Sequence, residues 1–218
     1  MSVDIKNRIV KEALYLFFDN GIKAITMDEL ANVMGISKRT IYENFKDKDE
    51  LLYECLVYNK CLLDKRFSTF CVETKNAIDL LVFFVVVNRK SVVNSGHRLM
   101  FELKKYHPAV FDFVICNHEP QKHSIFGNIF DMGVEQGYFR PDIQSEIIFI
   151  FIKNGFQSIF QNKNPEMPEK YSVGEIFEEA LKFCIRGITT EKGTQYYEEK
   201  LNDKEFIEHI KAIEKEQF

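Results

Sequence analysis

The sequence predicts an all-α fold, because apolar residues recur with helical spacing along almost the whole chain. Gly, Asn and Pro residues interrupt this spacing where helices commonly end, and no segment of useful length alternates with the period of a strand. The longest fully apolar runs, 80–87 and 147–152, fall short of the about 20 residues that cross a bilayer. We expect a small helical domain over residues 1–50 and a larger one over 51–218.

The first 50 residues predict short, well-capped helices. An amphipathic helix ends at Asn20-Gly21, a pair that tolerates the left-handed conformation of a C-cap. Thr26-Met-Asp-Glu29 has the form of a capping box and opens a second helix that ends at Gly35. A third helix opens at Ser37 or Lys38, and a fourth follows from Asp47. Short helices joined by a tight, glycine-containing turn are typical of the helix-turn-helix motif.

The rest of the chain predicts longer helices. Breaks are expected at Gly96, His107-Pro108, 137–142, 162–168 and 189–193. Pro120 lies inside one expected helix, which it would kink or split. The expected helices are 47–72, 75–94, 97–106, 108–137, 145–161, 172–187 and 203–216.

The third helix carries the candidate nucleic-acid chemistry. Ile41 and Phe45 lie four residues apart and face the core, so Arg39 and Glu43 lie opposite them. Thr40 and Tyr42 flank this outer face. Arg reads guanine in a major groove and hydroxyl groups reach bases or phosphates. The neighbouring cations Lys38, Lys46 and Lys48 suit phosphates.

Charge is concentrated where this motif lies. The whole chain has a net charge of -4, and residues 1–50 hold eight Lys/Arg against nine Asp/Glu. Residues 38–48 hold four basic residues against two acidic ones, a local net of +2. Any binding of DNA must therefore depend on a local patch. The alternative is that these are ordinary solvated charges on a small helical subdomain.

The stretch from Ile9 to Leu52 resembles the N-terminal domain of TetR-family regulators. The matching pieces are Ala13 with Phe17, Gly21, Thr26-Met-Asp-Glu-Leu-Ala31, Gly35-Ile-Ser37, Thr40-Ile-Tyr42, Phe45-Lys46 and Lys48-Asp-Glu-Leu51. The segments 137–142 and 183–187 resemble the family's body more weakly. The resemblance implies a three-helix helix-turn-helix DNA-binding domain followed by a larger helical ligand-binding and dimerisation domain.

The resemblance also implies roles for single residues. Thr26 caps its helix and faces a phosphate, Tyr42 contacts the backbone or a base, and Lys48 meets a phosphate. Glu43 departs from the family pattern, in which an aromatic residue, His or Arg is common. It could accept from cytosine N4 but would be repelled by phosphate. The expected DNA-binding residues are Thr26, Ser37, Lys38, Arg39, Thr40, Tyr42, Lys46 and Lys48.

The helix expected over 145–161 is apolar almost all round, whereas a surface helix needs only one apolar face. The surplus predicts a second buried side, against another subunit. TetR-like proteins form such a homodimer from two helices of each subunit, and a two-fold dimer suits a near-palindromic operator. The expected interface residues are Ile148, Phe151, Ile152, Phe156, Ile159, Phe177, Leu181 and Cys184.

Eighteen of the 21 Phe residues follow residue 50. They predict either a packed aromatic core or a partly apolar cavity. The resemblance implies a small hydrophobic effector that enters such a cavity and releases the repressor from DNA. The candidate pocket residues are Phe83, Phe84, Phe101, Lys104, Phe111, Phe126, Phe130, Asn154 and Gln157.

Other functions find little support in the sequence. It has no GxSxG, HExxH, Walker or dinucleotide-binding motif, so we expect no enzyme, catalytic residue, metal site or cofactor. Five scattered cysteines without CxxC and the absence of a signal-peptide pattern predict a cytoplasmic protein without a membrane partner. The alternative function is a helical hydrophobe-binding or protein-interaction module that no longer binds DNA.

Overall fold

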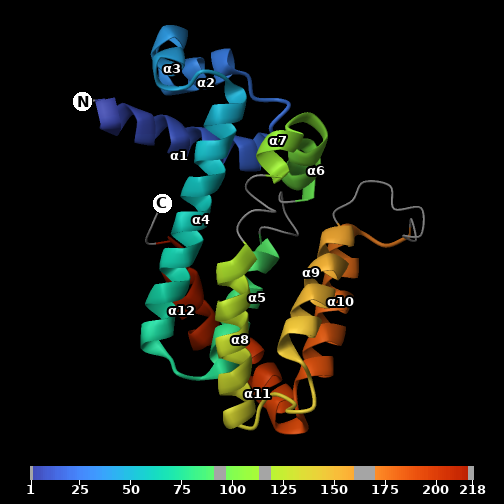
Figure 1. Ribbon diagram of the computed structural model, residues 1–218. Coiled ribbons are helices and arrows are strands. Elements are labelled where there is room, and N and C mark those ends of the chain that lie inside the picture. Colours follow the sequence, from blue (N-terminus) through green and yellow to red (C-terminus); the bar gives the residue numbers. More distant parts are fainter. Residues whose placement is uncertain (1, 91–96, 113–118, 160–169, 216–218) are drawn as a thin grey trace. The chain divides into compact units, whose positions relative to one another are not determined.

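A computed structural model describes the chain except residues 1, 91–96, 113–118, 160–169 and 216–218 (Figure 1). Over the described residues the fold is all-α, as predicted, and its only β-type pairing is an isolated bridge between Phe139 and Thr189. No helix in this part of the chain is long and apolar enough to cross a membrane. The helices are α1 (Ser2–Asn20), α2 (Met27–Met34), α3 (Lys38–Asn44), α4 (Lys48–Glu73), α5 (Ala77–Lys90), α6 (His97–Tyr106), α7 (Pro108–Phe111), α8 (Glu119–Glu135), α9 (Ser145–Ile159), α10 (Val173–Ile188), α11 (Glu191–Asn202) and α12 (Lys204–Lys215).

The chain forms two compact units. Unit 1 comprises residues 1–64 and 95–118, and unit 2 comprises 65–94 and 119–218. The long helix α4 supplies its first part to unit 1 and its last turns to unit 2. Unit 1 is therefore larger than the N-terminal domain expected over 1–50, because α6 and α7 belong to it.

Unit 1 has one apolar core that extends from the N-terminal helices to α6 and α7. Phe17, Ile41 and Phe45 are at most 2% exposed within it, and Leu103 and Phe111 join them from α6 and α7. Helices as short as α2 and α3 have too little apolar surface for a core of their own. The flanking helices α1, α4 and α6 supply the remaining apolar surface.

Three polar contacts fix α6 and its end onto the N-terminal helices of unit 1. An Arg98 Nη2–H donates to the Asp19 carbonyl at 2.8 Å, and the Lys23 N–H donates to Glu102 Oε2 at 2.8 Å. His107 Nδ1 lies 2.5 Å from Asp49 Oδ1 at the start of α4. These contacts join α6 to α1, to the loop after α1 and to α4.

Unit 2 is built from the end of α4 and the helices α5 and α8–α12. Helix α5 packs against α8, α11 and α12, and α9 packs against α8 and α10. Figure 1 shows α9 and α10 lying side by side. Aromatic rings fill much of the interior: Phe70 stacks on Phe83 at 4.4 Å between centroids, and Phe206 meets the edge of Phe70 at 5.9 Å.

One expectation about the helices in this region is wrong. Helix α11 lies partly over an expected break and was not predicted, because its sequence is polar and only Gly193 and Tyr197 are buried. The helix expected over 108–137 is described as α7 and α8, with residues 113–118 outside the description. Pro120 lies in the first turn of α8, where its missing N–H costs no helical hydrogen bond.

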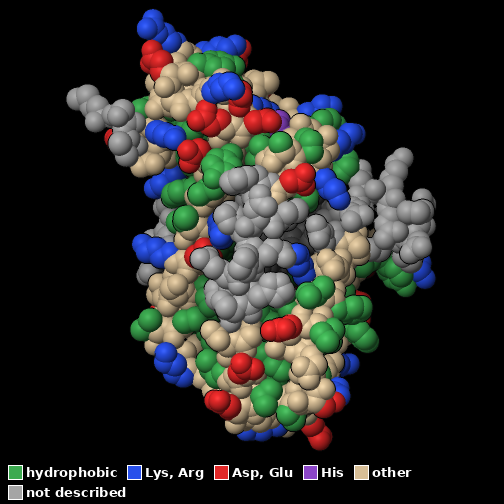
Figure 2. Space-filling model, viewed as in Figure 1, with side chains coloured by type: hydrophobic (Ala, Val, Ile, Leu, Met, Phe, Trp, Pro, Cys, Tyr) green, Lys and Arg blue, Asp and Glu red, His purple; other side chains and the backbone are tan. Residues whose placement is uncertain are grey.

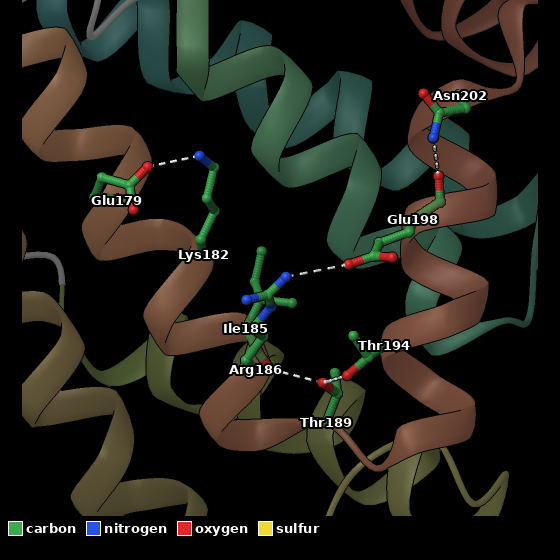
Figure 3. Close-up of polar contacts among 8 residues, drawn as sticks. All are labelled: Glu179, Lys182, Ile185, Arg186, Thr189, Thr194, Glu198 and Asn202. Carbon is green, nitrogen blue, oxygen red and sulfur yellow. Dashed lines mark hydrogen bonds and ion pairs between the residues drawn. The ribbon is translucent and has the colours of Figure 1, made fainter.

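The turn between α10 and α11 is closed by hydroxyl groups (Figure 3). The Thr189 hydroxyl, which is buried, donates to the Ile185 carbonyl at 2.8 Å and lies 2.6 Å from the Thr194 hydroxyl. Nearby, Arg186 of α10 pairs with Glu198 of α11 at 3.6 Å. The Ile185 carbonyl near the end of α10 thus accepts from both the hydroxyl and the N–H of the C-cap residue Thr189.

Candidate functional site

The ends of α2 and α3 are defined by capping residues and by the turn between the two helices. The capping box expected at Thr26 and Glu29 is present, with the Thr26 N–H donating to Glu29 Oε2 at 2.6 Å and the Glu29 N–H to Thr26 Oγ1 at 3.1 Å. The hydrogen bond from the Thr26 N–H to the Glu29 carboxylate holds the pKa of Glu29 below its usual value. Gly35 ends α2 in the left-handed conformation at φ +64°, and the Ser37 hydroxyl then caps α3 through the Thr40 N–H.

Helix α3 has a buried side and an exposed side, in the register that the sequence predicts. Ile41 is fully buried, whereas Arg39 and Glu43 are exposed and Tyr42 is 46% exposed. Arg39 Nε donates to Glu43 Oε1 at 2.8 Å, one helical turn further along. The exposed side of α3 therefore presents a guanidinium group, a phenol and a carboxylate to solvent.

Lys38 has a partner that the sequence did not predict. Its ammonium lies 2.6 Å from Asp28 Oδ1 of α2 and 5.8 Å from the centre of the Tyr42 ring. The hydrogen bond to Asp28 raises the pKa of Lys38. Asp28 lies ten positions earlier in the chain, and only the angle between α2 and α3 brings the two together. Figure 2 accordingly shows side chains of both signs crowded over α2 and α3.

Lys46 and Lys48 lie two positions apart but differ in burial. Lys46 is exposed. Lys48 is half-buried, and its ammonium donates to the carbonyls of Ile22 and Ile25 and lies over the ring of Phe17. This burial lowers the pKa of Lys48. An ammonium has three N–H donors, and the loop before α2 accepts two hydrogen bonds from this one.

The outer face of α9 and α10 is apolar. Ile147, Ile150 and Phe151 of α9 follow the i, i+3, i+4 spacing and are 65%, 50% and 64% exposed, and Phe183 of α10 is 73% exposed. Apolar side chains gather over this part of unit 2 in Figure 2.

Among the residues expected at an interface, Phe151 is exposed and Phe177 is buried within its own unit. The side chains of Phe156 and Ile159 lie outside the description. The remaining four are partly exposed: Ile148, Ile152, Leu181 and Cys184. Ile147, Ile150 and Phe183 are exposed apolar residues that the sequence did not single out, because periodicity alone does not say which side of an all-round apolar helix faces its own core.

The expected pocket residues are divided between the units. Phe101, Lys104 and Phe111 belong to unit 1, and the others to unit 2. Within unit 2, Phe84 and Asn154 are exposed, and the side chain of Gln157 lies outside the description. Phe83 is buried against Phe70.

An aromatic cluster joins α8 to α9 in unit 2. The rings of Phe126 and Phe149 lie 5.0 Å apart, and Phe130 lies 6.2 Å from Phe126. Phe126 and Phe149 remain partly exposed, whereas Phe130 is buried. In unit 1, a separate open groove of about 390 Å³ is lined by Asp49, Tyr53, Ala109 and Val110, none of which was expected in a pocket.

Comparison with known proteins agrees with this geometry. Residues 9–55 match the family described as bacterial regulatory proteins, tetR family. The chain is 23% identical over 195 residues to the HTH-type transcriptional repressor KstR2 of Mycolicibacterium smegmatis, an alignment covering 88% of this chain and 94% of that protein. It is 27% identical over 119 residues to the HTH-type transcriptional regulator SAUSA300_2515 of Staphylococcus aureus, covering 50% and 64%.

Solved structures share the fold. The ketosteroid transcriptional regulator KstR2 of Mycobacterium tuberculosis superposes with a TM-score of 0.54 at 21% identity, covering 85% of this chain and 95% of that one. A regulator from Saccharomonospora viridis in complex with choline has a TM-score of 0.63 at 17% identity, covering 87% and 100%.

The capped α2–turn–α3 arrangement, with its exposed basic and aromatic side chains, defines a helix-turn-helix DNA-binding protein of the transcription-regulator class. Residues 9–55 therefore form an N-terminal domain of the tetR family, and the relatives above support a TetR-family transcriptional regulator.

Proposed function

We propose that the protein is a repressor that binds a near-palindromic operator as a homodimer and leaves it when a small hydrophobic effector binds. The observation that carries the DNA-binding part is the exposed side of α3, where Arg39 lies opposite the buried Ile41 and Tyr42 flanks it. A rigid helix with its apolar side fixed in a core can present such side chains to a major groove. The naming of KstR2 as a repressor supports repression as the mode of action.

The division of roles follows from exposure. Arg39 and Tyr42, with Thr40 beside them, are the proposed base-reading residues, and Lys38 and Lys46 bind phosphates at either end of α3. Thr26 and Ser37 are caps whose side chains stand at helix N-termini, where backbone N–H groups also suit phosphate. Lys48 would offer its remaining donor to a phosphate while holding the loop before α2.

Replacing Arg39 by Ala is expected to weaken operator binding by about 10- to 100-fold, the range of a lost bidentate contact to guanine. Lys46→Ala should weaken binding of all duplexes by a similar factor and reduce the dependence of log affinity on log salt by about one. Both side chains are exposed, so the fold should be unaffected. The operator is first selected from a random duplex pool, and affinity is then measured by fluorescence anisotropy at several salt concentrations.

Lys211→Ala is the matched control, since Lys211 is an exposed lysine of α12 that pairs only with the neighbouring Glu208 among the described contacts. Its affinity and salt dependence should equal those of the original protein. Weak, salt-insensitive binding that Arg39→Ala and Lys48→Ala leave unchanged would contradict DNA recognition. That result would favour the alternative of a helical hydrophobe-binding or interaction module.

The effector part of the proposal is supported by the aromatic cluster between α8 and α9, in which Phe126 and Phe149 are partly exposed and Phe130 is buried. Apolar, aromatic linings are typical of small-molecule sites. The names of two relatives, a ketosteroid regulator and a regulator in complex with choline, also indicate small ligands.

An apolar effector should weaken operator affinity by about 5- to 150-fold, the usual range of allosteric coupling. It should also stabilise the DNA-free protein by about 2.7 kcal/mol when present at 100 times its dissociation constant. The test measures operator affinity and thermal unfolding with a ketosteroid, a long-chain fatty acid and choline. Phe126→Ala should abolish the response to the active apolar compound. Release by choline alone, or by none of the three, would contradict a hydrophobic effector.

A further inference from the structure

The position of Glu43 raises a physical question, because a carboxylate on a DNA-reading surface repels phosphate. An exposed ion pair one helical turn apart stabilises a helix by only about 0.3–0.5 kcal/mol. The pair with Arg39 is of this exposed type, with side chains 87% and 57% exposed. Stability therefore gives no sufficient reason for the carboxylate at this position.

The atoms that form the pair point to another role. Glu43 Oε1 accepts from Arg39 Nε at 2.8 Å. The two terminal nitrogens, Nη1 and Nη2, keep a pair of parallel N–H donors at the outer end of the guanidinium group. Guanine presents two acceptors, O6 and N7, in the major groove, and a bidentate arginine contacts both. A guanidinium held by its Nε can only approach such a base end-on.

We propose that Glu43 is a specificity-determining residue that positions Arg39 for end-on recognition of one guanine in the operator. This inference rests on the proposed function. The carboxylate limits the rotation of a long side chain before DNA arrives, so less conformational freedom is lost on binding. It also repels phosphate and thereby weakens binding to non-cognate duplexes.

The pair between Lys38 and Asp28 provides a matched control on the same surface. Asp28 also places a carboxylate beside a cation, and its Oδ1 lies 2.6 Å from the Lys38 ammonium. An ammonium is a point charge with rotatable donors and has no planar edge to orient. Removing Asp28 changes the net charge as much as removing Glu43 does, without affecting the orientation of Arg39.

The experiment compares the full-length protein with Glu43→Gln, Glu43→Ala, Asp28→Asn, Arg39→Ala and the double variant Arg39→Ala/Glu43→Ala. Each is titrated against the selected operator, against every single base-pair substitution of it, and against a random duplex. The original protein should discriminate by about 10- to 100-fold at one guanine, and Arg39→Ala should remove that preference.

Glu43→Gln and Glu43→Ala should reduce discrimination at that guanine to less than about 3-fold, whereas Asp28→Asn should keep it in the original range of a bidentate contact. All three should bind the random duplex more tightly by a similar factor, because each removes one negative charge. The double variant should discriminate no worse than Arg39→Ala alone, since both residues act on the same base.

Three results would overturn the proposal while leaving operator binding intact. If Glu43→Ala and Asp28→Asn discriminated equally well at that guanine, Glu43 would contribute only its negative charge. If the double variant also lost discrimination at a second base pair, Glu43 would read a base directly, for example cytosine through its N4 group. The proposal would also be excluded if Arg39→Ala left the preference for every guanine of the operator unchanged. Failure of the original protein to select any sequence would instead overturn the proposed function.

Discussion

Replacing Phe151 by Asp is expected to convert the protein from a dimer to a monomer at micromolar concentration. Phe151 lies with Ile147 and Ile150 on the exposed side of α9, and Phe183 extends the apolar surface from α10. A two-fold axis would bring the same surface of two subunits together, so one substitution places two carboxylates in the interface. Buried, unpaired carboxylates cost several kcal/mol each. Light scattering gives the mass directly.

The same variant should bind the operator about 100-fold more weakly or worse. In a dimer, binding at one half-site holds the second DNA-binding domain close to the other half-site, and a monomer loses this advantage. The fold of each subunit should persist, since Phe151 is 64% exposed and supports little of its own core. Val72→Asp is the matched control: Val72 is an 81% exposed apolar residue on α4, outside the proposed interface. A dimer that survives Phe151→Asp, or a monomeric original protein, would refute the interface.

Gly193→Ala is expected to lower the free energy of unfolding by about 2–4 kcal/mol, as over-packing of a rigid site does. A Cβ at Gly193 would lie 2.1 Å from the Tyr138 carbonyl oxygen and 2.9 Å from its carbon. Backbone atoms cannot swing aside as the end of a long side chain can. The Thr190 N–H donates to this same carbonyl oxygen at 2.9 Å. The clash would therefore separate the turn after α8 from the start of α11.

Urea unfolding at a fixed protein concentration measures the effect, and a fall in Tm of roughly 5–15 °C should accompany it for a chain of this size. Gly127→Ala in α8 is the control, because nothing lies within 4 Å of a Cβ built there. That change should be neutral or stabilising by up to about 1 kcal/mol, as for Gly to Ala inside a helix. An unchanged unfolding midpoint for Gly193→Ala would show that the contact between the two segments is not maintained.

The sequence predicted the N-terminal motif well because its signals are local. A capping box at Thr26 and a left-handed glycine at Gly35 each depend on residues within one helical turn. The buried side of α3, marked by Ile41 and Phe45, follows from spacing alone. Whether the exposed residues opposite bind DNA in the proposed way remains a prediction.

The features that the sequence did not predict depend on how helices pack. The pair of Lys38 with Asp28 requires the angle between α2 and α3, and the burial of Lys48 requires the loop before α2 to fold over it. Helix α11 has so few buried residues that its hydrophobic pattern is weak, and its clearest marker is the Thr190 cap. Local propensity does not contain such tertiary information.

The attachment of α6 has a mechanical consequence for the DNA-binding helices. Its contacts with Asp19, Lys23 and Asp49 lie on three different segments of unit 1. These contacts and the shared apolar core hold α6 against the N-terminal helices. We therefore expect a displacement of α6 to move α1–α3 together and to preserve the shape of the reading surface. Control of binding would then change the distance and angle between two intact reading surfaces, while each keeps its own base preference.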